Sequence, residues 1–95
     1  INIATSKGSD ARCVFEGKVV SVTKITNNNR AVIIRHGKYF SVYSNLEKVY
    51  VSAGDNVKTK EIIGKIHTTN EGNTTLHFEI WSGKTIQNPA YWIIR

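Results

Sequence analysis

The stretch "TLHFEIW", residues 75–81, alternates strictly between apolar and polar side chains. Successive side chains of a β-strand point to opposite faces, so this pattern predicts a strand with one face on a core. The apolar members, which we expect to face that core, are Leu76, Phe78 and Ile80. The opposite face carries a hydroxyl, an imidazole, a carboxylate and an indole, from Thr75, His77, Glu79 and Trp81. Such a row is suited to the floor of a groove.

The rest of the chain has the same character. Short runs rich in Val, Ile, Tyr, Phe and Thr are separated by Gly and Asn turns, such as "TNNNR" at residues 26–30. We expect strands at 12–15, 18–25, 31–36, 39–44, 49–51, 61–66, 76–81 and 84–86. So many short strands must close on themselves or stack to cover their apolar faces and edges. The predicted fold class is therefore all-β, a compact antiparallel barrel or sandwich.

A second stretch, "YFSVYSNL" at residues 39–46, could border the same groove. Alternation places Phe40, Val42 and Ser44 on one face. The other face then carries Tyr39, Ser41, Tyr43 and Asn45. If this strand neighbours 75–81, we expect Tyr43 and Asn45 to line the groove.

Length and composition limit the possible functions. The chain has 95 residues and a formal charge of +6, from 13 Lys and Arg against 7 Asp and Glu, and it fits one domain, residues 1–95. The basic residues are dispersed, so we expect no nucleic-acid binding. No apolar run is long enough to span a bilayer. The one cysteine, Cys13, lies in an apolar stretch and is expected to be a buried, inert thiol.

The row on 75–81 resembles part of a zinc site but does not complete one. A zinc hydrolase needs about three protein ligands and an open position for water. His77 is a single candidate, and a salt bridge to His77 explains Glu79 equally well. His36 and His67 lie at strand ends, where we expect hydrogen-bonded or solvated loop histidines.

Nearly the whole chain resembles the LytM or lysostaphin-type zinc endopeptidase domain, which cleaves peptide crosslinks of bacterial peptidoglycan. The resemblance runs through "INIATSKG", "HGKYFSVYSNL", "VSAGDNVKTKEIIGKI", "LHFEIW" and "NPAYW". It implies a barrel-sandwich hybrid fold. It also implies a zinc held by an HxxxD segment and the second His of an HxH segment, with catalytic histidines in HxH and YxHL.

Carried over by position, most of that site is replaced. The ligand Asp falls at Asn2, and the HxxxD histidine would precede Ile1. The YxHL histidine falls at Asn45 and the first His of HxH at Thr75, so only His77 matches. Asn and Thr do not titrate near neutral pH and cannot serve as general bases. We therefore expect no enzymatic activity and no zinc or other cofactor.

This pattern is similar to the degenerate LytM domains of murein hydrolase activators of the EnvC type. The resemblance implies a non-catalytic domain whose former active-site groove binds and switches on a cell-wall N-acetylmuramoyl-L-alanine amidase in the periplasm, during cell division. The expected groove residues are Asn2, Tyr43, Asn45, Thr75, His77, Glu79 and Trp81. Trp81 stands where the family often has arginine, and Trp92 is expected to be buried and to anchor the last strand.

Two alternatives remain open at this point. One is a residual zinc endopeptidase whose missing histidine comes from upstream sequence or another chain. The other is a passive peptidoglycan-binding module, for which the basic charge is suitable. Because the sequence begins at Ile1 without a methionine, we expect it to be the C-terminal part of a longer protein.

Overall fold

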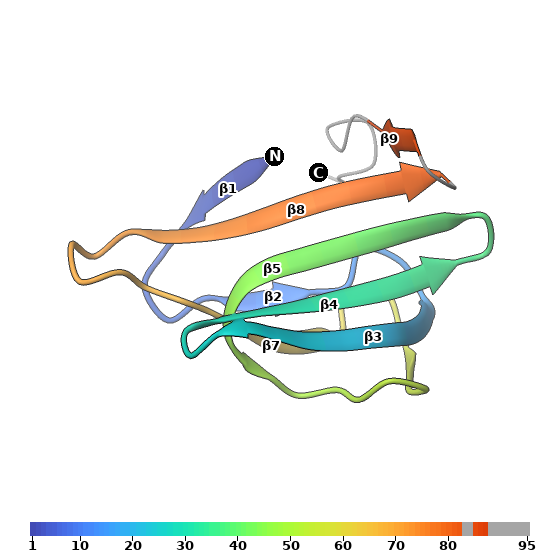
Figure 1. Ribbon diagram of the computed structural model, residues 1–95, viewed down its shortest axis with the longest axis horizontal. Coiled ribbons are helices and arrows are strands. Elements are labelled where there is room, and N and C mark those ends of the chain that lie inside the picture. The colour runs from blue at the N-terminus through green and yellow to red at the C-terminus, as the bar shows by residue number, and fades with distance from the viewer. Residues whose placement is uncertain (83–84, 88–95) are drawn as a thin grey trace.

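The computed structural model describes residues 1–82 and 85–87, which form one antiparallel sheet of nine strands curled into a half-barrel (Figure 1). This confirms the all-β class. The strands are β1 (Asn2–Thr5), β2 (Asp10–Arg12), β3 (Gly17–Thr26), β4 (Asn29–His36), β5 (Tyr39–Val49), β6 (Asn56–Val57), β7 (Ile62–Ile66), β8 (Thr74–Ser82) and β9 (Thr85–Gln87). Within these residues no helix has the length and hydrophobicity needed to cross a bilayer.

Strand β5 connects the two parts of the sheet. The main path runs β1-β8-β5-β4-β3-β6, while β7 pairs with β5 and β2, and β9 pairs with β8. The first part of β5 pairs with β8, from Tyr39 opposite Ser82 to Ser44 opposite His77. Its last part pairs with β7 instead, beginning at Leu46 opposite Ile66. The sheet therefore curls where β5 changes partner.

Asn45 lies at this change of partner. Its φ of 69° is in the left-handed region, which Asn tolerates better than most residues. The register with β4 shifts at the same point, from Val32 opposite Tyr43 to Arg30 opposite Leu46. An extra residue of this kind is a β-bulge, which bends a strand and redirects its side chains. The bulge therefore ends the regular alternation of β5 at Ser44.

The core lies inside the curl. The rings of Tyr43 and Phe78 pack with centroids 5.2 Å apart, and Leu76, Phe78 and Ile80 are buried as expected. Each such side chain contributes about 1.5 to 3 kcal/mol when removed from water. The buried apolar residues are Ala11, Cys13, Val19, Val32, Ile34, Tyr43, Leu46, Val57, Ile63, Ile66, Leu76, Phe78 and Ile80.

The sequence-based strand assignments are correct for the long strands and for the shorter β7 and β9, which were expected at 61–66 and 84–86, but they fail for other short strands. Strands β1 and β6 were not expected, because four and two residues carry too little alternation to be recognised. The strand expected at 12–15 is instead β2, at Asp10–Arg12, and the one at 49–51 is not separate, because β5 continues to Val49. Trp92 and Lys84 lie outside the described residues.

The expected face of Tyr43 is wrong. Tyr43 is 1% exposed, and its hydroxyl accepts a hydrogen bond from the Val14 backbone N–H at 3.0 Å. Burial raises the pKa of this phenol well above its usual value.

Cys13, 1% exposed, is the buried thiol that was expected. It donates to the Phe15 carbonyl at 2.6 Å, and burial raises its pKa.

The Tyr43 hydroxyl gives a test of this core. We expect Tyr43→Phe to lower the free energy of unfolding by about 1 to 2 kcal/mol, because it leaves the partly buried Val14 N–H without its acceptor. Tyr50→Phe is the matched control, since Tyr50 is 55% exposed and a surface change of this kind costs at most about 0.5 kcal/mol. Urea unfolding of both variants measures the difference. Equal stabilities would contradict the buried hydrogen bond.

Candidate functional site

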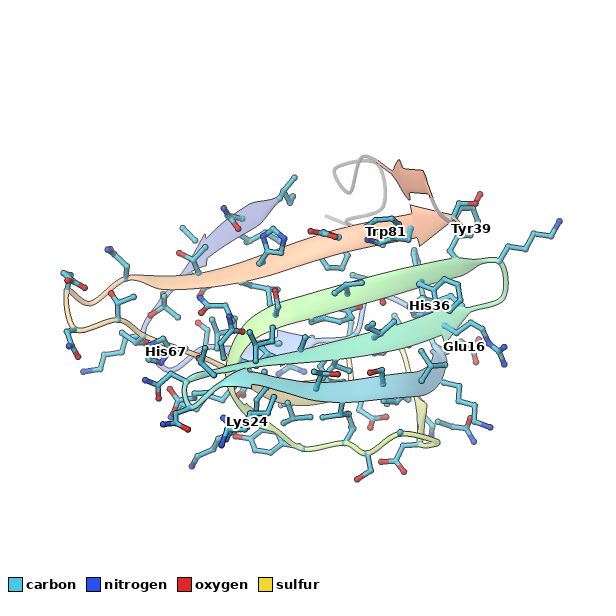
Figure 2. The ribbon with its side chains drawn as sticks, viewed as in Figure 1. Glu16, Lys24, His36, Tyr39, His67 and Trp81 are labelled. Atoms are coloured by element: carbon cyan, nitrogen blue, oxygen red, sulfur yellow. The ribbon has the colours of Figure 1, made fainter. Side chains whose placement is uncertain are left out.

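A row of hydrogen-bonded side chains runs along the outer face of β8. We call Asn2, His77, Glu79 and Trp81 the polar row; Figure 2 shows Trp81 toward one end of β8. The pairing of β1 with β8 brings Asn2 opposite His77. Asn2 Oδ1 lies 2.7 Å from His77 Nδ1, and His77 Nε2 donates to Glu79 Oε2 at 2.6 Å. The indole Nε1 of Trp81 donates to the other Glu79 oxygen at 2.8 Å.

Both ring nitrogens of His77 are engaged in either protonation state. As an imidazolium, His77 donates to Asn2 Oδ1 and to Glu79. As a neutral ring, it donates from Nε2 and accepts at Nδ1 from the Asn2 amide turned about its axis. Neither arrangement leaves a ring lone pair directed at a metal ion.

The Glu79 carboxylate holds the polar row together electrostatically. Hydrogen bonds from His77, and then from Trp81, hold the pKa of this carboxyl below its usual value, against the opposing effect of burial. The ion pair is only partly shielded, with the side chains of His77 and Glu79 41% and 27% exposed. The ion pair therefore fixes the orientation of the two side chains more than it stabilises the fold.

Asn45 and Thr75, the positions at which the resemblance places two catalytic histidines, are in contact. The Asn45 side-chain amide donates to the Thr75 carbonyl. The Asn45 backbone N–H donates to Asn29 Oδ1 at 2.8 Å, and its carbonyl accepts from the His67 N–H at 2.9 Å. Asn45 is thus hydrogen-bonded to three separate segments of the chain, and its side-chain amide makes one of these bonds.

Tyr43 is absent from this face, and other residues of β5 take its place. Opposite the polar row, β5 presents Ser44 beside His77, Val42 beside Glu79 and Phe40 beside Trp81. Sequence reasoning divided residues 39–44 into the correct two sets but assigned Tyr43 to the groove, and it missed the bulge that separates Asn45 from the Tyr43 set. The pairing register was the missing information, since an apolar Phe and Val look like the core side of a strand.

An apolar hollow continues the polar row. It has a volume of about 400 Å³ and is lined by Val20, Ile33, Phe40, Val42 and Trp81. Trp81 belongs to both features, with its indole N–H on Glu79 and its ring in the hollow. Val20 is 40% exposed, so the hollow is open to solvent. Polar row and hollow together form what we call the groove.

The other histidines lie away from the polar row, toward opposite ends of the sheet (Figure 2). His36 Nε2 lies 2.6 Å from Ser41 Oγ and its Nδ1 lies 2.8 Å from the Glu16 carbonyl, which confirms a hydrogen-bonded histidine at a strand end. Nowhere in residues 1–82 and 85–87 do three His, Cys, Asp or Glu side chains gather as a metal site. The donors around His77 are an amide and one hydrogen-bonded carboxylate, which do not fit a zinc site.

Several bacterial proteins are similar to this chain in sequence. The chain is 26% identical to the murein hydrolase activator EnvC of Escherichia coli, with 98% of this chain and 23% of that protein covered. It is 31% identical to the activator NlpD of the same organism, covering 98% and 25%. An uncharacterized metalloprotease of Buchnera aphidicola is 29% identical, covering 94% and 24%. The chain thus spans about a quarter of these relatives.

The fold is shared with a solved structure. Helicobacter pylori Csd3 superposes with a TM-score of 0.85 at 23% identity, covering 99% of this chain and 26% of that one. The model of Peptidase family M23 matches residues 1–89, which include the polar row and all strands of the sheet. The chain belongs to peptidase family M23.

Proposed function

We propose that this domain is a non-catalytic activator of peptidoglycan hydrolases and that its groove binds a zinc amidase. The observation that carries the proposal is the polar row. Its retained family ligand, His77, is hydrogen-bonded on both ring nitrogens, to Asn2 at 2.7 Å and Glu79 at 2.6 Å. A hydrolytic site would need that imidazole for zinc.

The neighbouring positions support the same conclusion. A general base must titrate near the working pH and must reach the water that it deprotonates. Asn45 and Thr75 do not titrate near neutral pH, and the Asn45 amide donates to the Thr75 carbonyl. On these grounds the domain has neither the ligands nor the base of a metallopeptidase, and zinc is not its cofactor.

The groove has the properties of a protein-binding surface. Interface energy concentrates in aromatic anchors beside apolar pockets, with polar groups that fix orientation. Trp81 and the apolar hollow supply the aromatic anchor and its pocket, and Glu79 and His77 supply the polar groups. A partner segment with an apolar side chain for the hollow and a hydrogen-bond donor for Glu79 is complementary to this surface.

The class of partner comes from the relatives. Two of them, EnvC and NlpD of Escherichia coli, are named murein hydrolase activators. By this likeness the partner is a cell-wall N-acetylmuramoyl-L-alanine amidase and the place of action is the periplasm, during daughter-cell separation. Residual zinc peptidase activity is the second candidate, favoured by the similar metalloprotease of Buchnera aphidicola.

Amidase stimulation tests the groove directly. We expect the protein to raise the rate at which a purified amidase releases peptides from murein. Trp81→Ala should weaken half-maximal stimulation at least about tenfold, because it removes an aromatic anchor. Tyr50→Ala is the control, an exposed aromatic outside the groove, and should stimulate like the wild type. Equal stimulation by both variants would remove the groove from the proposal.

Zinc titration separates the two candidate functions. We expect calorimetry to show no stoichiometric zinc binding at micromolar concentrations, since His77 lacks a lone pair directed outward and Asn2 is a weak ligand. Metal analysis of the purified protein should agree. A stoichiometric ion that is lost in His77→Ala would instead establish the metallopeptidase.

The pH dependence of stability tests the polar row. Because the folded pKa of Glu79 is lowered, its contribution is fully present above the unfolded value, near pH 4.5, and is lost as pH falls through the folded pKa. Glu79→Gln should therefore be less stable than wild type at pH 7, by up to about 1 kcal/mol. Urea unfolding should show this difference shrinking below pH 4.5. A difference independent of pH would refute the charged acceptor.

A further inference from the structure

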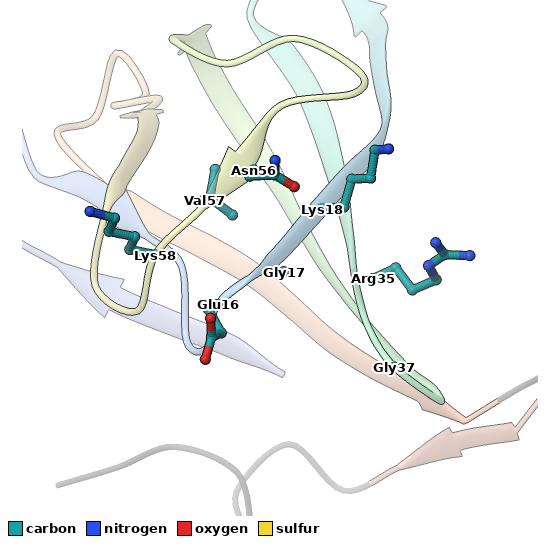
Figure 3. A pocket seen from close by; sticks show the side chains of 8 residues that line it. All are labelled: Glu16, Gly17, Lys18, Arg35, Gly37, Asn56, Val57 and Lys58. Carbon is teal, nitrogen blue, oxygen red and sulfur yellow. The ribbon is translucent and has the colours of Figure 1, made fainter.

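A second pocket lies where β3, β4 and β6 meet (Figure 3). It has a volume of about 570 Å³ and shares no lining residue with the apolar hollow. Three basic side chains and one acidic side chain surround it. Its lining residues are Glu16, Gly17, Lys18, Arg35, Gly37, Asn56, Val57 and Lys58.

Two of the cations are forced together by the pairing of the strands. Lys18 lies opposite Arg35 on β4 and opposite Asn56 on β6. Figure 3 shows the side chains of Lys18 and Arg35 extending to the same side. Like charges directly opposite one another on neighbouring strands are unfavourable. An anion bound between Lys18 and Arg35 would attract both side chains and so offset their mutual repulsion.

No carboxylate of the described chain neutralises this pair. Across residues 1–82 and 85–87, only His77 and Glu79 meet the geometry of an ion pair. The carboxylate of Asp55 accepts the Ser52 N–H at 2.8 Å and forms an ion pair with neither cation. Lys18 and Arg35 are both exposed, so their charged groups are available to a ligand from solution.

One wall of the pocket depends on a close approach of β3 to β4 at Gly17. A Cβ at Gly17 would lie 2.8 Å from His36 Nδ1 and 2.9 Å from Ile34 Cγ2, and would also collide with the Arg35 carbonyl oxygen. Only glycine therefore lets β3 approach β4 at this point. Because the ring of His36 also bonds the Glu16 carbonyl at 2.8 Å, the wall that carries Glu16 and Arg35 is held in place.

We infer that this pocket binds the carboxylate end of a peptide, of the kind that murein carries. The Arg35 guanidinium can hold a carboxylate with two parallel hydrogen bonds, and Lys18 adds a point charge beside it. Glu16, on the same pocket, suits the amide or ammonium groups of the peptide and disfavours a multiply charged phosphate. The carboxylate site stands on these contacts alone, whereas murein as its source rests on the proposed function.

The test uses the dipeptide alanyl-alanine, its C-terminal amide and inorganic phosphate, each titrated at constant ionic strength. Backbone amide shifts of Gly17, Gly37 and Asn56 report binding at the pocket. The variant is Lys18→Gln with Arg35→Gln, and the charge-matched control is Lys24→Gln with Lys48→Gln, two exposed lysines outside the pocket. Thermal unfolding verifies that both double variants are folded.

We expect saturable shifts with the dipeptide, no saturation with its amide, and binding about tenfold weaker in the pocket variant but unchanged in the control. Equal binding of the amide, an equal loss in the control, or tighter binding of phosphate would overturn the carboxylate site.

Co-sedimentation with murein sacculi tests whether murein is the source of the carboxylate. A pocket variant that sediments like wild type would exclude murein. Trp81→Ala should keep dipeptide binding, so failure of the groove and failure of this pocket are distinguishable.

Discussion

The antiparallel register between β5 and β8 determines both the core and the groove. Tyr43 lies opposite Phe78 and both face inward, so Val42 and Glu79 must face outward together. A slip of one residue would exchange the faces of the whole strand. It would bury the His77 and Glu79 pair in an apolar interior and expose Phe78. Burying such charges costs several kcal/mol, which fixes the register that places the polar row in solvent.

Local pattern was sufficient for β8 and insufficient for β5. In residues 75–81 the two faces differ sharply in polarity, so the inward set could be read directly. In residues 39–44 the faces differ little, and hydrophobicity favours Phe40 and Val42 as the core. The inward choice of Tyr43 depends on distant partners, such as the Val14 N–H, 29 residues away. The alternation of side chains within one strand carries no information about a hydrogen bond to a residue so distant in the sequence.

The composition of the groove was predictable mainly through family resemblance. Strand β1 has only four residues, and its contact with His77 joins positions 75 residues apart, so spacing alone could not bring Asn2 to the groove. The resemblance did bring Asn2 there, and it also named Asn45 and Thr75 as groove residues, without predicting their contact. The contact between Asn45 and Thr75 forms at the bulge, where Asn45 has a positive φ. This backbone conformation is not visible in the pattern of side chains.

The substitutions around His77 are consistent with one another as a site without a metal ion. An Asp at position 2 would place a second carboxylate beside the one on Glu79, and without a cation the two would repel. The Asn2 amide is neutral and can either accept from or donate to Nδ1, so it satisfies His77 in both of its protonation states. The polar row is thereby ordered before any partner arrives. A preordered surface loses less conformational entropy on association, which favours the binding role that we propose for the groove.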